Sequence, residues 1–208
     1  MREVSELWNP AHHLVLASKS ASRRGLLAAV GIPFEAVSAE IEERAIEDAF
    51  FARGGAGEEL AAHLARAKAL EVSRRRPKAL CLGADQVLSL DGRIFHKADS
   101  LEEARNHLAQ LAGRTHRLTS AFAIAWNGEI LHEAEDHAEL SMRPLDAPGI
   151  ARYLDIVGPT ALTSVGGYQI EAIGAHLFGR VQGDHSTILG LPILPLLAWL
   201  RSRGAILL

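Results

Sequence analysis

The chain has 208 residues, of which 48% are hydrophobic and 23% are charged, and its formal net charge is −3. This composition is typical of a globular protein and excludes a disordered, collagen-like or coiled-coil chain. The small negative charge argues against a bulk electrostatic grip on DNA or RNA, so we expect no nucleic-acid partner. The length fits a single domain over residues 1–208.

Three features favour a cytoplasmic protein with no membrane partner. Cys81 is the one cysteine and cannot form an internal disulfide, as is usual in a reducing compartment. Residues 1–10 lack the basic and apolar regions of a signal peptide. The longest apolar run, residues 189–200, is interrupted by two prolines and falls short of the roughly 20 residues that a membrane span needs.

The first half of the chain predicts strands alternating with helices. We expect a buried strand over 13–17, a helix opened by Ser18, Ser20 and Ser22 and ended by Gly31, and a second strand over 34–38. An acidic stretch (40–48) and a flexible connection (53–57) precede a strong helix over 58–75. A long strand over 79–90 then turns at Asp91-Gly92 into 93–95.

The second half adds a hairpin and more helices. Ser100 with Glu103 forms a capping box for a helix through Leu111. Residues 115–126 and 129–142 flank Asn127-Gly128 and predict a hairpin, followed by a short helix over 146–157. Residues 164–183 are rich in glycine and predict strands and turns around a site, and Pro192 opens a last helix ending near Arg203. These elements predict an α/β fold with a mixed sheet.

Two charged residues stand where packing alone would not place them. When the helix over 58–75 is drawn with a rotation of about 100° per residue, Lys68 falls in the middle of its apolar face. It either extends to solvent along its aliphatic stem or binds a partner inside the protein. Asp85 lies within an apolar strand, where a buried carboxylate is costly unless it is paired or holds a metal. The alternative is that Asp85 caps nearby backbone amides at a strand bend.

Four groups of residues complement one another around a single ligand: Ser18 to Arg24, the acidic pair Glu42 and Glu43, Lys68, and Asp85 with Lys97. A helix N-terminus with serines and arginines favours phosphate. Neighbouring carboxylates would repel phosphate unless a divalent cation lies between them, and Mg²⁺ is usually held by one or two carboxylates plus substrate phosphates. The combination predicts metal-assisted chemistry on a polyphosphate.

Other enzyme classes lack their main motifs. The sequence contains no Walker A loop, no dinucleotide-binding glycine pattern after a strand and no nucleophile elbow. The string HEAEDH at 132–137 has one residue too many between its histidines for a zinc protease motif, and we interpret it as the solvated face of a strand.

The blocks LVLASKSASRR, IEE at 41–43, LARAKA around Lys68, GADQV around Asp85, HKADS around Lys97, LAGRTHRLTSA from 111 and GDHSTILGLP from 183 resemble the Maf family of nucleotide pyrophosphatases. Their order and spacing match over almost the whole chain. Two departures are minor, since alanine replaces the usual proline at Ala21 and Ala98 without removing a charge.

The resemblance implies an elongated mixed β-sheet with flanking helices, forming two lobes around a central cleft and similar to the inosine triphosphatase fold. It also implies hydrolysis of a nucleoside triphosphate to a nucleoside monophosphate and pyrophosphate, with Mg²⁺ or Mn²⁺ as cofactor and a homodimer as the assembly. Asp85 matches the proton acceptor and Glu43 the other metal-associated acid, while Arg23, Lys68 and Lys97 match phosphate-binding positions. Ser18 and Ser20 match the loop that cradles the phosphate in that family.

Three positions bear on the choice of base. Gln86 and Glu171 follow the branch of the family that acts on 7-methyl-GTP, whereas Ser22 follows neither that branch nor the one that acts on dTTP and UTP. A carboxylate accepts from the guanine edge and favours a methylated, cationic base, although Glu171 can instead pair with a nearby arginine. Without an aromatic at Ser22 the site lacks a stacking partner worth about 1 kcal/mol. The alternatives are the same reaction on dTTP or UTP, and a nucleotide-binding regulator of septum formation with little catalysis.

Overall fold

The computed structural model describes residues 7–208. The first six of the residues 1–10, in which we expect no signal peptide, therefore lie outside the described part. The described residues form two compact units. Unit 1 comprises the described residues up to Gln86 together with Ser120–Asp136 and His185–Leu208, and unit 2 comprises Val87–Thr119 and His137–Asp184. The site residues before 87 belong to unit 1, whereas Lys97 and Glu171 belong to unit 2.

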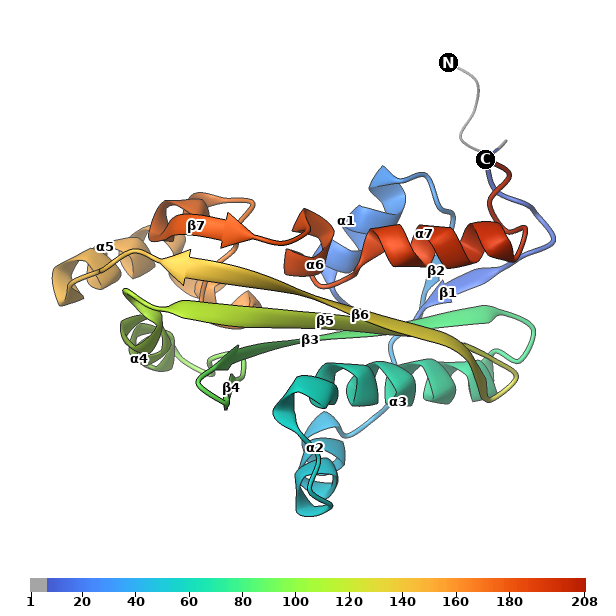
Figure 1. Ribbon diagram of the computed structural model, residues 1–208, viewed down its shortest axis with the longest axis horizontal. Helices are drawn as coiled ribbons and strands as arrows, with labels where there is room; N and C mark the ends of the chain where they lie inside the picture. Colours follow the sequence, from blue (N-terminus) through green and yellow to red (C-terminus); the bar gives the residue numbers. More distant parts are fainter. Residues whose placement is uncertain (1–6) are drawn as a thin grey trace. The chain divides into compact units, whose positions relative to one another are not determined.

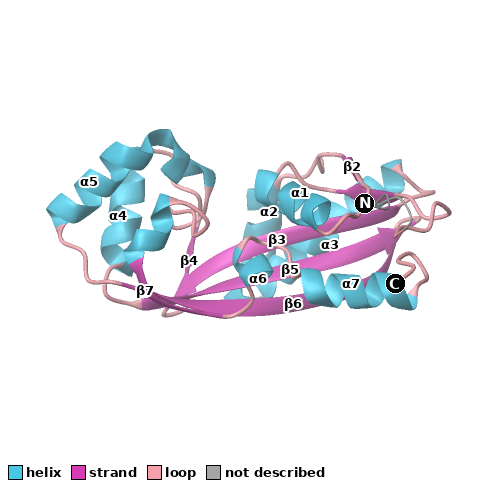
Figure 2. Cartoon of the chain, turned by 90° about the horizontal axis from the view of Figure 1, so that it is seen from above, coloured by secondary structure: helices cyan, strands magenta, loops and turns pink. Residues whose placement is uncertain are grey.

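The strands form one mixed sheet, which confirms the predicted fold class (Figures 1 and 2). Its order is β2-β1-β3-β5-β6-β7, with β4 paired to β3, and the strands are β1 Leu14–Leu16, β2 Glu35–Ala36, β3 Leu80–Leu90, β4 Arg93–Phe95, β5 Thr115–Trp126, β6 Glu129–Met142 and β7 Phe178–Gln182. Strand β1 pairs in parallel with both β2 and β3, whereas β4 and β7 pair antiparallel to β3 and β6. Both predicted two-residue turns are present, with positive φ at Asn127 and Gly128 and at Asp91 and Gly92.

The helices of unit 1 are α1 Ala21–Ala29, α2 Glu43–Ala52, α3 Leu60–Arg75, α6 His185–Ile188 and α7 Ile193–Ser202, with the short 3₁₀ helix η2 Gly57–Glu59. Those of unit 2 are α4 Leu101–Leu111, α5 Ala147–Val157, η3 Gly158–Thr163 and η4 Ile173–Leu177. The acidic stretch at 40–48 is thus largely helical. The glycine-rich segment 164–183 contains turns, as we expected, but only one named strand, β7, which follows the 3₁₀ helix η4.

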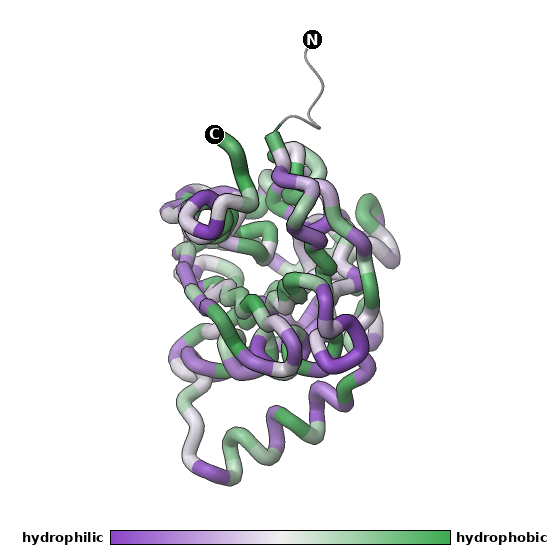
Figure 3. Tube along the Cα trace, turned by 90° about the vertical axis from the view of Figure 1, so that its right-hand side faces the viewer, coloured by the Kyte–Doolittle hydropathy of each residue, from purple (hydrophilic) through white to green (hydrophobic). Residues whose placement is uncertain are grey.

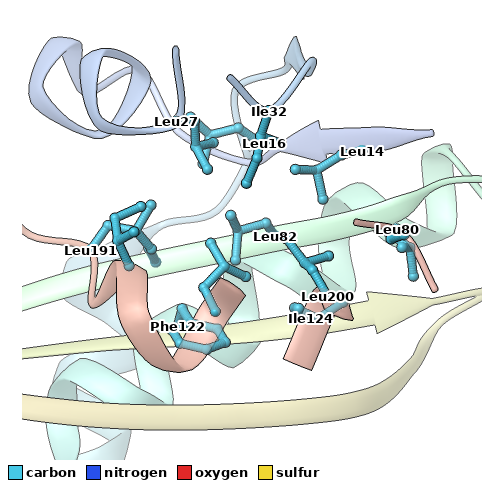
Figure 4. Close-up of a cluster of buried hydrophobic side chains, with 14 of the residues drawn as sticks. Leu14, Leu16, Leu27, Ile32, Leu80, Leu82, Phe122, Ile124, Leu191 and Leu200 are labelled. Atoms are coloured by element: carbon cyan, nitrogen blue, oxygen red, sulfur yellow. The ribbon is translucent and has the colours of Figure 1, made fainter. Parts of the chain in front are cut away.

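Strand alternation gives the sheet of unit 1 two apolar faces. On one face Leu14, Leu16, Leu80 and Leu82 pack with α1 and α7, forming the core in Figure 4. On the other face the adjacent residues Val15, Ala17 and Cys81 pack against Val72 of α3, and Figure 1 shows α3 on the opposite side of these strands from α7. Residue 85 has the same parity as Cys81, so its side chain points to the α3 face.

Hydrophobic and hydrophilic residues interleave along the trace (Figure 3). Within residues 7–208, none of the helices combines the length and the apolar character needed to cross a bilayer. Strand β6 shows the alternating exposure expected of a half-solvated strand. This pattern confirms the interpretation of HEAEDH as part of a solvated strand face.

Candidate functional site

The predicted site residues of unit 1 gather where β1 ends and β3 continues beyond it. Leu16, the last residue of β1, pairs with Leu82, and Asp85 lies three residues further along β3. The chain leaves β1 through Ser18 and Ser20 and enters α1 at Ala21. The predicted strand-to-helix junction is therefore present, and it brings the N-terminus of α1 beside the part of β3 that extends beyond β1.

The two serines of this junction organise the start of α1. The Ser18 hydroxyl accepts a hydrogen bond from the backbone N–H of Ser20 at 3.1 Å, and the Ser20 hydroxyl caps the helix by accepting from the N–H of Arg23 at 3.3 Å. The first N–H groups of a helix have no acceptor within the helix, and together with the helix dipole they favour an anion. Ser22, in the first turn, is half-buried, and its side chain has no hydrogen-bond partner within the described chain.

Lys68 joins the two predicted acidic residues. Its Nζ donates to Asp85 Oδ1 at 2.6 Å and lies 3.1 Å from Glu43 Oε1. Lys68 is 7% exposed and Asp85 is 9% exposed, whereas the Glu43 side chain is 54% exposed. Lys68 therefore does not extend to solvent, and Asp85 binds an ammonium group rather than backbone amides.

Gly83 explains how the helix that carries Lys68 comes so close to β3. A Cβ at Gly83 would lie 2.2 Å from the Ala65 carbonyl oxygen and 2.5 Å from the Ala69 backbone nitrogen. Only glycine leaves room for this approach, and the small residues Ala65 and Ala69 complete the contact. Lys68 lies between these two alanines in the sequence, so the contact places its side chain over Asp85.

Arg23 adds a second buried cation. Its Nη2 lies 4.0 Å from Asp85 Oδ1, its Nη1 donates to the Ser18 hydroxyl at 3.3 Å and its Nε donates to the Gly190 carbonyl at 2.8 Å. Burial lowers the pKa of the Arg23 guanidinium, while the negative charges of Asp85 and Glu43 act in the opposite direction. An arginine stays protonated under such conditions, so the cluster holds two cations and two anions.

The donor set fits a divalent cation that is bound together with substrate. Within residues 7–208 there is no group of three or more histidine, cysteine or acidic residues able to hold a metal ion. Asp85 and Glu43 supply two carboxylates, and Lys68 occupies one oxygen of each. Mg²⁺ commonly takes one or two carboxylates and completes its shell with water and phosphate oxygens, so these residues fit such an ion.

Gln86 points to the opposite face of β3 from Asp85, because successive strand residues alternate. Its Nε2 lies within hydrogen-bond distance of Ser120 Oγ, the Thr187 carbonyl and the Ile188 carbonyl, at 3.0, 3.0 and 2.8 Å. The structure thus places Gln86 in a polar network of unit 1. Its contact with a base stays a prediction.

In unit 2 the remaining predicted residues are exposed. Lys97 forms an isolated backbone bridge with Val165, at the start of the loop that carries Glu171. Within the part of the chain that the structure describes, neither the Lys97 ammonium nor the Glu171 carboxylate has an ion-pair partner. Glu171 is therefore not engaged by an arginine of the described chain. That these two residues act on the same substrate as the cluster of unit 1 stays a prediction.

Unit 2 also contains a cavity of about 190 Å³ beside this loop. Most of its lining is aliphatic or aromatic, with contributions from α5, η3 and the loop residues Gln169 and Ala172. None of the predicted site residues lines it. The cavity therefore lends no support to a role in metal-assisted chemistry on a polyphosphate.

Comparison with known proteins places the chain in a family. A "7-methyl-GTP pyrophosphatase" from Rhizobium etli is 50% identical over 193 residues, covering 93% of this chain and 97% of the relative. A "Nucleoside triphosphate pyrophosphatase" from Rhodopseudomonas palustris (strain BisB5) is 51% identical over 197 residues, covering 95% and 96%.

A crystal structure of a nucleoside-triphosphatase, or dITP/XTP pyrophosphatase, from Mycobacterium abscessus covers 92% of this chain and 95% of that one. At 17% identity and a TM-score of 0.39 this likeness supports no argument. The family model described as "Maf-like protein" matches residues 13–203. The chain belongs to the Maf-like protein family.

Proposed function

We propose that this chain hydrolyses a nucleoside triphosphate between the α and β phosphates, giving a nucleoside monophosphate and pyrophosphate, and that 7-methyl-GTP or a related modified nucleotide is its substrate. The observation that carries the proposal is the buried Lys68 ammonium between Asp85 and Glu43, beside Arg23 and the N-terminus of α1. The names of the relatives support the same reaction.

The basic groups bind and orient the triphosphate. Arg23 and the first N–H groups of α1 bind the phosphate oxygens, and Lys68 adds a compact positive charge. Phosphoryl transfer depends mainly on positioning and on stabilising charge that develops on phosphate oxygens. Lys97 is exposed and has no partner within the described residues, so it can pair with a further phosphate oxygen.

Asp85 accepts the proton of the attacking water. Its Oδ1 is held by Lys68, and within the described chain its Oδ2 has no hydrogen-bond partner. As the water oxygen bonds to the α phosphorus, its proton passes to Asp85, the α–β anhydride P–O bond breaks and pyrophosphate leaves with the bonding electron pair. Glu43 and Asp85 would hold Mg²⁺ or Mn²⁺ with the phosphate oxygens, and such an ion neutralises charge on the phosphates when bound.

The choice of base depends on which hydrogen-bond acceptors the protein presents to the N–H groups of the base. A carboxylate at Glu171 accepts from the N–H groups at the guanine edge and attracts a base made cationic by methylation. Thymine and uracil present only one donor there. With serine at 22 the chain lacks an aromatic stacking partner, so we expect weaker discrimination than a stacked base would give.

The decisive assay is a panel of nucleoside triphosphates with pyrophosphate detection, with and without EDTA. We expect turnover of 7-methyl-GTP that EDTA abolishes and added Mg²⁺ or Mn²⁺ restores. Turnover of dTTP and UTP with none of 7-methyl-GTP would overturn the assigned base. Nucleotide binding without turnover of any triphosphate would instead favour the regulatory alternative.

A pair of matched variants tests the role of Asp85. Asp85→Asn keeps the shape of the side chain but removes the proton acceptor, so we expect turnover to be lost while nucleotide binding remains. The control is Asp91→Asn at the exposed turn that follows β3, where the Asp91 side chain is 72% exposed. Undiminished turnover in Asp85→Asn would remove Asp85 from the mechanism.

The sequence-based predictions of a homodimer and of no nucleic-acid partner complete the proposal. Size-exclusion chromatography with light scattering tests the first. Binding to duplex DNA across a range of salt concentrations tests the second, because a nucleic-acid binder loses affinity steeply as salt rises.

A further inference from the structure

The segment His185–Gly190, comprising α6 and the two residues after it, is firmly anchored within unit 1. We call it the 185–190 turn. The Thr187 hydroxyl donates to Asp136 Oδ2 of β6 at 2.7 Å, and the Ser186 hydroxyl accepts from the N–H of Ile193 at 3.0 Å. Thr187 is fully buried. These two hydrogen bonds therefore tie the turn to β6 and to the start of α7.

The 185–190 turn fixes which end of the Gln86 amide faces the protein. Ser120 Oγ donates its proton to the Thr187 carbonyl at 2.7 Å, so it can only accept from Gln86. The other two partners are the backbone carbonyls of Thr187 and Ile188, which accept by nature. With three acceptors around one end of the amide, that end must be the NH₂ group. Within the described residues Gln86 Oε1 has no partner.

The same turn holds the Arg23 guanidinium. The Gly190 carbonyl accepts from Arg23 Nε at 2.8 Å, and Nη2 of the same guanidinium lies 4.0 Å from Asp85 Oδ1. A Cβ at Gly190 would lie 3.3 Å from Nε and 3.4 Å from Nη2, and the φ of +96° is one that residues with side chains rarely adopt. Glycine at this position therefore lets the guanidinium lie directly against the turn.

We propose that the 185–190 turn is a positioning element of the site, and that it makes Gln86 a hydrogen-bond acceptor, presenting Oε1 to an N–H or O–H group of the substrate. Its three carbonyls, from Thr187, Ile188 and Gly190, orient two side chains. One is Arg23, which the proposed function assigns to triphosphate binding, and the other is Gln86, which the sequence analysis relates to the choice of base, so the inference rests on that function. Thr187 acts through Gln86 and does not touch substrate.

Two substitutions at Thr187 separate positioning from simple packing. Thr187→Val keeps the volume but removes the bond to Asp136, whereas Thr187→Ser keeps the hydroxyl and loses a buried methyl group. Both variants should lower the melting temperature. We expect kcat/KM for the preferred triphosphate to fall about tenfold in Thr187→Val and to stay within about twofold in Thr187→Ser. Equal losses in the two variants, or none in Thr187→Val, would overturn the proposal.

Hydrogen exchange of the Gln86 side-chain amide tests the orientation without any enzymatic assay. In ¹⁵N-labelled protein its NH₂ signals are identified by their loss in Gln86→Met. Exposed Gln182 is the internal control, because its Oε1 accepts from Arg180 and its NH₂ has no partner within residues 7–208. We expect the Gln86 amide to exchange at least about tenfold more slowly. Equal rates would refute the orientation even if the chain hydrolyses triphosphates, and protection would support it even if no triphosphate is hydrolysed.

The Arg23 half is tested by matched glycine substitutions. Gly190→Ala adds a Cβ against the guanidinium, whereas Gly204→Ala carries comparable backbone strain at a φ of +69° with nothing within 4 Å of its Cβ. We expect Gly190→Ala to raise the KM for the triphosphate about tenfold relative to Gly204→Ala. Equal KM values in the two variants would contradict the assignment of Gly190.

Discussion

Gly83→Ala should damage the site without touching any charged residue. The new Cβ would lie 2.2 Å from the Ala65 carbonyl oxygen and 2.5 Å from the Ala69 nitrogen, both backbone atoms that cannot rotate away. Restoring an ordinary contact requires α3 to move away from β3 by about 1 Å, because tight contacts in packed interiors lie above roughly 3 Å. Such a shift would stretch the 2.6 Å bond between Lys68 and Asp85 beyond hydrogen-bond range.

The expected cost follows from overpacking. Adding a methyl group to a filled interior costs about 1–3 kcal/mol, which corresponds to a fall of about 3–10 °C in the melting temperature of a chain of this size. A misplacement of about 1 Å in a catalytic group can lower turnover about 100-fold. Differential scanning fluorimetry and the pyrophosphate assay measure the two effects.

Gly25→Ala in α1 is the matched control. Nothing lies within 4 Å of a Cβ at Gly25, and alanine in a helix interior is favoured over glycine by about 0.5–1 kcal/mol. This variant should be at least as stable as the parent and fully active. If Gly83→Ala matches Gly25→Ala in melting temperature and turnover, the close approach of α3 does not position Lys68 and the reasoning fails.

Three further predictions use other groups. Lys68→Met should abolish turnover and destabilise the fold by about 3 kcal/mol in urea titrations, because it leaves the Asp85 carboxylate buried without its ammonium partner; unchanged stability would show that Arg23 alone compensates it. Burial lowers the pKa of His116 from 6.5 to about 4. As the pH falls below 6.5, the unfolded chain therefore binds a proton at this histidine before the folded chain does, which favours unfolding. The free energy of unfolding should drop by about 3 kcal/mol by pH 4 relative to the variant His116→Gln, which does not titrate. Burial raises the pKa of the Cys81 thiol to about 11, so iodoacetamide should label the native protein at pH 8 only after denaturant is added, and rapid native labelling would contradict this.

The elements that the sequence predicts well are those with local signals. Ser100 caps α4 by accepting from the N–H of Glu103, and Asp146 caps α5 in the same way. Asn127-Gly128 adopts the positive φ values that its turn requires. In each case one or two side chains determine the backbone conformation, so the pattern can be recognised without knowing the rest of the fold.

Helix α2 shows why other elements are harder to predict. Its N-cap, Glu42, makes no capping hydrogen bond with its side chain, and the sequence over 40–48 shows only an acidic composition. The helix is held by tertiary packing, with Phe50 buried 4.9 Å from the His63 ring and against Gly55. Such contacts join residues whose proximity depends on the path of the chain, which propensity does not report.

The residues of the site also fall into those that the sequence reveals and those that only the packing reveals. Lys68 and Asp85 are detectable in the sequence because each breaks the apolar pattern of its own element. Gly83 and the 185–190 turn carry no such signal, since a glycine in a strand and carbonyls in a short helix look ordinary until the packing is known. The GDHSTILGLP block contains the turn and contributes to the family resemblance, but only the structure shows that its carbonyls accept hydrogen bonds from Gln86 and Arg23.

The charge balance of the cluster argues that these groups serve binding rather than stability. Arg23 and Lys68 carry two positive charges, and Asp85 and Glu43 carry two negative ones. Removing the charges of Arg23, Lys68 and Asp85 from water costs several kcal/mol per ion, so this largely buried part of the network adds little to stability compared with apolar side chains of similar volume. On the proposed function, phosphate oxygens of a bound triphosphate pair with Arg23 and Lys68, while Asp85 Oδ2, which has no hydrogen-bond partner within the described residues, accepts the proton of the water.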